Sequence, residues 1–371
     1  MKIATITFHR AQNFGSVLQS YALQQFVIQC GETCGTPIQY QIIDLTTEAQ
    51  RDLYSIFKPS LHFGDLAKNI VNLVYAKAMF TRQKKFENFL HRELSLTPTF
   101  FTEKEACKGL QHVDCLISGS DQLWNVRARD CADFYYLNFM PDVRKISYAA
   151  SFGPLFIDWK QYDSEKYTRF LENYSCISVR EKGSAKNVRQ LTNKNCEIHV
   201  DPTLLLSANE WRKLQSDATY NDGKYILLYC LEPSRKQLQM VRAISKKFKL
   251  PIVALRYNNK HDMFNSYVKR YDAGPKDFLA YIDHAAMVVT SSFHGTAFSI
   301  IYRKPFCVLN GMRDKRIANI LEETGLTNHS IDSLDEIDRV SLKAPDKSSI
   351  HSYLSHEKQR SFEYLKQSIP L

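Results

Sequence analysis

Short apolar segments of strand length alternate with helical patterns along most of this chain. The segments are rich in Ile, Val, Tyr or Cys, and amphipathic stretches separate them. Strands that are separated by helices form parallel, doubly wound sheets. The chain is therefore expected to be an α/β protein. The predicted strands are 2–8, 39–45, 114–118, 145–150, 175–180, 197–200, 225–231, 251–257, 287–290 and 306–309.

A polar stretch at residues 216–223 separates two such series and is predicted to be a linker. A length of 371 residues also favours two domains. We therefore predict two Rossmann-like domains, residues 1–215 and 224–345, with a cleft between them. Residues 346–371 are expected to form a C-terminal helix that could cross back to the first domain.

The segment from residue 287 to 306 carries the strongest chemical signal. An apolar strand is followed by Ser291 and Ser292, which are N-cap residue types, then by His294, Gly295 and an apolar helix. A helix N-terminus attracts anions through its N–H groups and its dipole. Because histidine exchanges protons near neutral pH, His294 is a candidate acid/base beside a bound anion. The alternative is that His294 only caps its own helix.

Polar residues also follow strands of the first half. Asn13 and Gly15 open a helix after the first strand, where plain turn chemistry is the alternative. Arg180 ends another strand and could bind a carboxylate or phosphate in bidentate fashion. The alternative for Arg180 is a surface ion pair with Glu181.

Residues 118–125 gather several polar side chains and one aromatic ring at a strand end. Hydroxyls of a sugar need donors and acceptors, and its C–H face stacks on a ring, so this segment is expected to bind a sugar. The alternative is a turn whose Asp and Asn satisfy backbone groups. The residues concerned are Ser120, Asp121, Gln122, Trp124 and Asn125.

Composition excludes several classes of protein. The formal charge of +10 and the pI near 9.0 suit anionic partners, but no nucleic-acid-binding motif is present, so no nucleic acid is expected. The nine cysteines are scattered without a C-x-x-C pair, so neither a metal site nor a disulfide framework is expected. There is no apolar run of ~18 residues and no signal-peptide pattern at the start, which predicts a cytoplasmic protein.

A basic segment between residues 51 and 92 also has a helical apolar pattern. Such a segment can lie on an anionic membrane surface, which would make the protein weakly peripheral at the inner face of the membrane. The alternative is that its apolar face packs on the core and its cations are solvated. The cations are Arg51, Lys58, Lys68, Lys77, Arg82, Lys84, Lys85 and Arg92.

The ordered motifs resemble those of the polysaccharide pyruvyl transferase family from about residue 3 to about residue 310. The motifs are N-F-G-S-V-L-Q-S-Y-A-L (13–23), S-G-S-D-Q-L-W-N (118–125), S-Y-A-A-S-F-G (147–153), S-V-R-E-K (178–182), D-P-T-L-L (201–205) and T-S-S-F-H-G-T-A-F-S (290–299). The resemblance implies a fold like that of the GT-B glycosyltransferases. It implies transfer of a pyruvyl group from phosphoenolpyruvate to a sugar, which gives a carboxyethylidene ketal and phosphate without a cofactor. The implied acceptor is a hexose of a bacterial capsule, exopolysaccharide or lipid-linked repeat unit.

The resemblance also assigns roles to residues. His294 and Arg180 match the family's histidine and arginine and are the expected catalytic pair. The first domain is the expected acceptor side, with Asn13, Gly15 and the 120–125 residues named above. The second domain is the expected donor side, with Ser291, Ser292 and Gly295. Some family members have Arg where this chain has Ser292, so the phosphate cation is expected from Arg256, Lys260 or Arg303.

Two other functions remain open. One is a nucleotide-sugar-dependent glycosyltransferase of the GT-B-like fold, although no acidic residue follows His294 before Arg303 to bind a ribose. The other is a catalytically silent binding protein of the same fold.

Overall fold

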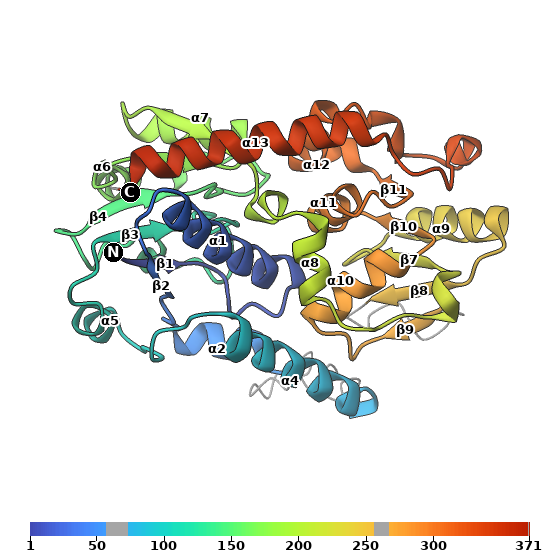
Figure 1. Cartoon of the computed structure of the whole chain (residues 1–371), viewed down its shortest axis with the longest axis horizontal. Helices are drawn as coiled ribbons and strands as arrows, with labels where there is room; N and C mark the ends of the chain where they lie inside the picture. The colour runs from blue at the N-terminus through green and yellow to red at the C-terminus, as the bar shows by residue number, and fades with distance from the viewer. Residues whose placement is uncertain (57–72, 256–266, 370) are drawn as a thin grey trace. The chain divides into compact units, whose positions relative to one another are not determined.

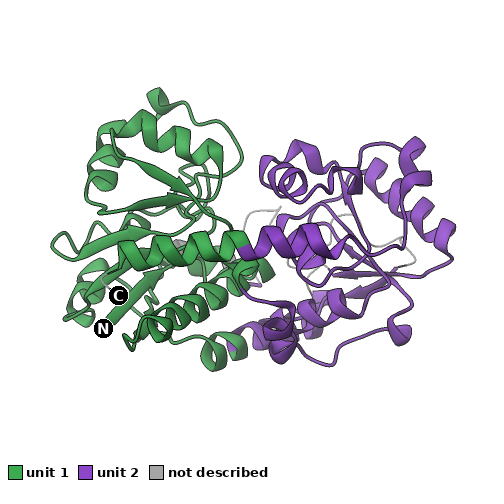
Figure 2. Ribbon diagram, turned by 45° about the horizontal axis from the view of Figure 1, so that its top comes forward, with its two compact units in different colours: residues 1–55, 88–205, 356–371 green, residues 56–87, 206–355 purple. Residues whose placement is uncertain are grey.

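A computed structural model describes residues 1–56, 73–255, 267–369 and 371 (Figure 1). The predicted α/β class is confirmed, because every strand pair recorded in the described residues is parallel. The chain divides into two compact units, coloured in Figure 2. Unit 1 comprises Met1–Ser55, Asn88–Leu205 and His356–Leu371, and unit 2 comprises Ile56–Glu87 and Leu206–Ser355.

These units differ from the predicted ranges in two ways. Ile56–Glu87 belongs to unit 2, and the change of unit falls after Leu205. The expected C-terminal helix is present, and the chain from His356 onward belongs to unit 1. Two long helices, α4 (Ala76–Glu93) and α13 (Lys347–Ser368), run from unit 2 into unit 1.

Unit 1 contains a sheet in the order β2-β1-β3-β4, which isolated bridges from β4 extend to the pair β5-β6. This doubly wound order changes direction between β1 and β3. The strands are apolar and largely buried, as expected for a parallel sheet covered on both faces. They are β1 (Lys2–Ile6), β2 (Gln39–Ile42), β3 (Cys115–Ser118), β4 (Arg144–Ser147), β5 (Ile177–Val179) and β6 (Cys196–Ile198).

Polar caps begin most helices of unit 1. The Asn13 side chain accepts a hydrogen bond from the Gly15 N–H at 2.9 Å and so starts α1. A capping box of Thr47 and Gln50 starts α2. The helices are α1 (Phe14–Thr33), α2 (Glu48–Tyr54), α5 (Glu103–Gly109), α6 (Ser164–Glu172) and α7 (Lys182–Leu191), with 3-10 turns at Asp133–Tyr136, Trp159–Gln161 and Pro202–Leu205.

Unit 2 has a single sheet in the order β12-β11-β10-β7-β8-β9. Numbered within the unit and read from its other edge, this is the 3-2-1-4-5-6 order of a Rossmann sheet, and its direction changes between β7 and β10. Its strands are β7 (Ile226–Tyr229), β8 (Ile252–Leu255), β9 (Val268–Arg270), β10 (Met287–Thr290), β11 (Phe306–Leu309) and β12 (Ser330–Ile331).

The helices of unit 2 follow the same capping chemistry. Ser207 and Ser234 form capping boxes, and Pro275 occupies the first turn of α10. The helices are α8 (Ala208–Leu214), α9 (Arg235–Phe248), α10 (Pro275–His284), α11 (Phe293–Ile301) and α12 (Lys315–Glu323), with 3-10 turns at Asn221–Gly223, Gly311–Arg313, Thr327–His329 and Leu334–Arg339.

Each unit has its own hydrophobic core. Leu116, Trp124 and Tyr136 lie in the core of unit 1, and Leu228 and Val289 lie in that of unit 2. Complete burial of one such side chain contributes ~1.5–3 kcal/mol. Two separate cores leave the carboxyl ends of each sheet available to position polar side chains.

Candidate functional site

His294 lies at the point in unit 2 where the sheet changes direction. The Thr290 hydroxyl at the end of β10 donates to the Tyr229 carbonyl at the end of β7 at 2.7 Å, which joins the two strands at that point. Helix α11 begins three residues later, with His294 as its second residue. Ligands of open α/β sheets bind outside the carboxyl ends of strands at such a point. The predicted strand–helix junction is confirmed, and its position in the sheet is that of a ligand site.

Close packing shapes this junction. Ser292 is the N-cap residue in extended conformation, and its N–H donates to the Thr290 hydroxyl at 3.0 Å. A Cβ on Gly295 would lie 2.3 Å from the Thr290 Oγ1 atom, so only glycine fits there. Within the described part of the chain, the Ser292 side chain makes no capping hydrogen bond to the first turn. An anion could therefore meet that turn directly.

The His294 side chain is largely enclosed. The residue is 8% exposed, and its ring meets Phe293 edge-on with the centroids 5.2 Å apart. Enclosure excludes most water from the imidazole, which suits proton transfer to a bound substrate.

Of the three cations expected to bind the donor phosphate, Arg303 is the one that the structure describes. Arg256 and Lys260 fall outside the described residues. Arg303 follows the last turn of α11, nine residues after His294 and so about 13 Å along the helix axis. The structure therefore does not place Arg303 at the start of α11, and its role in donor binding stays a prediction.

Arg316 is a cation at this junction that the sequence did not single out. Its guanidinium carbon lies 5.9 Å from the Phe293 ring centroid, and Asp314 pairs with it at 2.6 Å. Arg316 follows β11, the neighbour of β10 in the sheet. Adjacent parallel strands end at the same edge, and that relation could have identified Arg316.

In unit 1 the change of direction between β1 and β3 brings two of the motifs together. The Ser16 hydroxyl donates to the Asp121 carboxylate at 2.6 Å, and Asn13 caps the same helix. Gly15 lies in the first turn of α1 and is buried. The two loops expected to bind the acceptor are thus adjacent at the carboxyl edge of the sheet.

Arg180 joins the same cluster but is not an open anion site. Its guanidinium donates to Asp201 at 2.6 Å and to Asp121 at 3.5 Å, and Glu181 lies 3.7 Å away. Burial alone would lower the pKa of Arg180, but the three carboxylates raise it. Buried carboxylates already match the charge of Arg180, so its predicted role as a donor clamp stays a prediction. Arg180 also holds Asp121 in place.

The prediction that Trp124 stacks on a sugar is wrong, because Trp124 is a core residue. It is completely buried and stacks on Tyr136 at 5.4 Å between centroids, with Phe152 and Tyr174 at its other sides. Ser120 is completely buried as well. The loop after β3 therefore turns these two side chains into unit 1.

Gln122 and Asn125 remain half-exposed in that loop. The Asn125 amide donates to the Gln122 carbonyl oxygen at 2.9 Å. Gly153 has a φ of +85° and packs closely against this pair. A Cβ on Gly153 would lie 2.6 Å from the Asn125 amide nitrogen, so a larger residue would not fit. Together with Asn13, these are the half-exposed residues of the set expected to bind the acceptor.

A cluster of the buried His9 and Asp44 with the part-exposed Arg10 was missed by the sequence analysis. The Asp44 carboxylate contacts the His9 Nε2 atom at 2.9 Å and pairs with the Arg10 guanidinium. Burial would raise the pKa of Asp44, but the hydrogen bonds from Arg10 and His9 lower it well below its usual range. The sequence feature that could have revealed this cluster is His9 itself. It follows the predicted strand 2–8, at the carboxyl edge of the sheet where Asn13 also lies.

The basic segment contains cations with structural partners inside unit 2. Arg82 is 2% exposed and donates to the Ala273 carbonyl at 3.0 Å, and Lys85 pairs with Asp277 at 2.7 Å. Arg82 therefore does not face solvent as a membrane-binding surface requires, and Lys85, whose side chain is part-exposed, is held by an ion pair. Lys77 and Lys84 of α4 are exposed, and Lys58 and Lys68 lie outside the described residues.

In the described ranges, no group of three or more His, Cys, Asp or Glu side chains could hold a metal ion. No described helix combines the length and the apolar character needed to cross a bilayer.

A model of the polysaccharide pyruvyl transferase family matches residues 13–311 of this chain. No curated protein sequence matches it. Solved structures of UDP-GlcNAc 2-epimerases resemble the whole chain. That of Neisseria meningitidis bound to UDP-GlcNAc has a TM-score of 0.52 and 11% identity over 99% of this chain and 100% of that chain.

Two further epimerases give the same result. That of Rickettsia bellii has a TM-score of 0.50 and 10% identity over 100% of this chain and 99% of that one. That of Methanocaldococcus jannaschii has a TM-score of 0.50 and 12% identity over 94% of each chain. At these identities the likeness establishes the GT-B-like fold alone.

Proposed function

The chain belongs to the polysaccharide pyruvyl transferase family, and we propose that it moves a pyruvyl group from phosphoenolpyruvate to a hexose of a bacterial surface polysaccharide or its lipid-linked repeat unit. The observation that carries the proposal is the position of His294. A histidine of the family motif stands at the start of α11, where the Rossmann sheet of unit 2 changes direction.

The proposed reaction needs one acid, two sugar hydroxyls and an anion site. His294 delivers a proton to the methylene carbon of phosphoenolpyruvate, which creates an oxocarbenium-like centre at the adjacent carbon. One hydroxyl attacks that centre and releases its proton. A second hydroxyl then displaces phosphate and releases its proton, which completes the ketal. No cofactor takes part in this scheme.

Residues near α11 suit the donor. The N–H groups of its first turn and the Arg316 guanidinium are the proposed ligands of the phosphate or carboxylate, because both favour negative charge. Ser291 and Ser292 contribute hydroxyls at the same turn, and Gly295 allows the close approach to Thr290. Some family members have an arginine where this chain has Ser292. Arg316 would supply the cation that this arginine provides in those members.

Residues of unit 1 suit the acceptor. The half-exposed Gln122 and Asn125 amides can each donate to and accept from sugar hydroxyls. The buried link from Arg180 through Asp121 to Ser16 holds this loop against α1. Preorganised polar groups of this kind orient a diol better than mobile ones.

A lipid-linked acceptor would bring the enzyme to a membrane surface. Leu73 and Val74, which precede α4, are exposed, and so are Lys77, Phe80 and Lys84 within α4. Apolar side chains flanked by lysines bind anionic bilayers peripherally. We propose weak contact with the inner face of the membrane through this surface, which we call the α4 surface.

The test is a product analysis with two donors. The purified chain is incubated with a hexoside acceptor panel and either phosphoenolpyruvate or a nucleotide sugar. The proposal predicts release of phosphate and an acceptor whose mass increases by that of a carboxyethylidene group, only with phosphoenolpyruvate. Consumption of the nucleotide sugar instead would assign the chain to the glycosyltransferases.

A further inference from the structure

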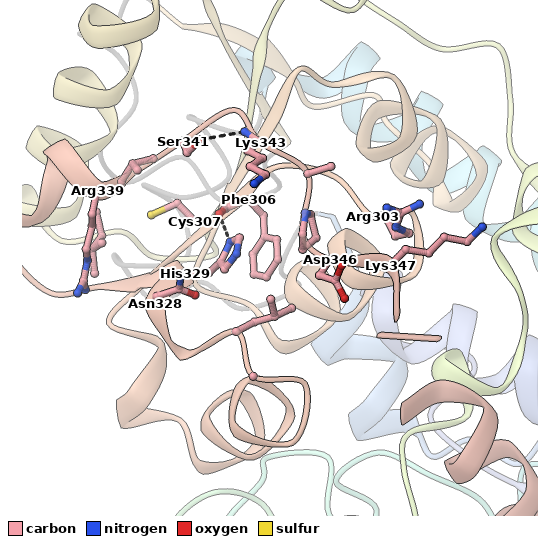
Figure 3. A pocket seen from close by; sticks show the side chains of 16 residues that line it. Arg303, Phe306, Cys307, Asn328, His329, Arg339, Ser341, Lys343, Asp346 and Lys347 are labelled. Atoms are coloured by element: carbon pink, nitrogen blue, oxygen red, sulfur yellow. Dashed lines mark hydrogen bonds between the residues drawn. The ribbon is translucent and has the colours of Figure 1, made fainter. Parts of the chain in front are cut away.

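Unit 2 contains a cavity of about 560 Å³ that the proposed reaction does not use (Figure 3). Phe306 begins β11 and His329 directly precedes β12, so the cavity lies at the amino ends of these strands. His294, in contrast, follows the carboxyl end of β10. The volume is that of a typical small-molecule pocket, and its position separates it from the proposed donor site.

Cations dominate the polar lining of this cavity. Arg303, Arg339, Lys343 and Lys347 line it, and Asp346 is the one acidic residue among the lining residues. Arg339 is paired with Glu336 at 2.6 Å. Among the residues that the structure describes, the other three cations make no ion pair. The lining therefore keeps a positive charge that a bound anion could match.

The single carboxylate is occupied by the chain itself. Asp346 accepts hydrogen bonds from the N–H groups of Ser348 at 2.9 Å and Ser349 at 3.1 Å, at the start of α13. The first turn of α13 is thus already capped. A ligand's negative charge would be met by the cationic side chains rather than by this helix end.

Apolar and aromatic side chains form much of the remaining wall. The His329 ring stacks on Phe306 at 4.4 Å with an angle of 18°, and its Nδ1–H donates to the Phe306 carbonyl at 3.0 Å. Leu326, Ile331 and Val340 complete this side. The cavity consequently offers a surface for a ring or carbon body as well as charge for an anion.

We propose that this cavity binds a small organic phosphate, with Arg303 and Lys343 beside the phosphate and the carbon body against the His329 side. Charge-assisted hydrogen bonds hold the phosphate, and burial of apolar area adds the second part of the affinity. This site is separate from pyruvyl transfer and stands whether or not the chain performs that reaction.

The experiment uses the full chain with methyl-labelled Ile, Leu and Val, and phenyl phosphate as the probe. Titration followed by NMR is expected to shift the methyl signals of Ile331 and Val340. In the double variant Arg303→Gln/Lys343→Gln, the dissociation constant measured from these signals should rise at least fivefold. The matched control Lys213→Gln/Lys246→Gln removes two exposed cations elsewhere in unit 2 and should leave the constant unchanged.

Three results would overturn the proposal. The first is that phenyl phosphate leaves the Ile331 and Val340 signals in place at millimolar concentration. The second is an equal loss of affinity in both double variants, which would reduce the effect to general charge. The third is an unchanged constant in Arg303→Gln/Lys343→Gln when its remaining methyl signals show an intact fold.

Discussion

The Ser16 hydroxyl donates to the Asp121 carboxylate at 2.6 Å and so joins two loops that are far apart in the chain. Asp121 in turn contacts the Arg180 guanidinium, which also pairs with Asp201 and Glu181. Four of the motifs that define the family therefore meet in one buried cluster of unit 1. This cluster explains why these polar residues occur together without all of them touching a substrate.

Arg180→Ala is expected to destabilise unit 1 rather than to weaken donor binding selectively. Removal of one partner from a buried ion pair costs ~3–5 kcal/mol because the carboxylates are left without their cation. Urea unfolding is the measurement. Arg189→Ala, which removes an exposed cation of the same unit, is the control and should change stability by less than ~0.5 kcal/mol. A fully stable Arg180→Ala protein with reduced affinity for phosphoenolpyruvate would support the donor-clamp role.

The strands could be predicted from the sequence because their apolar runs are long enough to be distinctive. β9 and β12 were missed, since Val268–Arg270 is half-exposed and Ser330–Ile331 has only two residues. Pairing within the sheet, not composition, makes these segments strands.

The site was predictable only in part. His294 was found because a strand, cap residues and an apolar helix adjoin it in sequence. The environment of Trp124 could not be read in this way, because the direction of a side chain in a loop depends on rings such as Tyr136 that lie elsewhere in the chain. The carboxylates around Arg180 come from Asp121 and Asp201, which only the fold brings together.

Asp44→Asn should remove a contribution to stability that depends on pH. The pKa of Asp44 is lowered in the folded protein, so its stabilisation is complete above the unfolded value near 4 and is lost as the pH falls through the folded value. The variant should lose ~3–5 kcal/mol at pH 7, where the buried His9 and the part-exposed Arg10 lose their carboxylate partner, and less at pH 3. Unfolding at both pH values checks this. The exposed Asp142→Asn should show no such difference, and equal losses at both pH values would contradict the assignment.

His199 should make unit 1 sensitive to mild acid. Burial, with a smaller contribution from the charge of Arg360, lowers the pKa of His199 to about 4, although the exposed Glu197 lies 3.1 Å away. In the unfolded chain His199 binds a proton near pH 6.5, whereas in the folded chain it stays neutral until the pH approaches 4. Stability therefore falls as the pH drops from about 6.5 towards 4. Between pH 7 and pH 5 the loss should reach about 2 kcal/mol.

Urea midpoints of wild type and His199→Gln at pH 7 and pH 5 measure that loss. The variant should be less stable at pH 7, because it loses the ring contact with Tyr364, yet lose less on acidification. A pH dependence equal to that of the wild type would show that another group is responsible.

Binding of the α4 surface to membranes should depend on Lys77 and Lys84. We expect wild type to sediment with anionic vesicles at low salt and not with neutral ones, because each lysine near the surface contributes ~1 kcal/mol. Lys77→Gln/Lys84→Gln should stay in the supernatant, whereas the exposed pair Lys104→Gln/Lys108→Gln should sediment like wild type. Loss of binding in both double variants would indicate a general charge effect and contradict a specific surface.

The release of phosphate from phosphoenolpyruvate by His294→Gln, measured with an acceptor that wild type converts, tests the central claim most directly. A general acid of this kind contributes ~10²–10⁴-fold, so turnover should fall by that factor while the affinity for phosphoenolpyruvate changes little. The exposed His351→Gln serves as the matched control and should retain wild-type turnover. Near-normal phosphate release by a folded His294→Gln protein would contradict the account and leave His294 as a structural residue of α11.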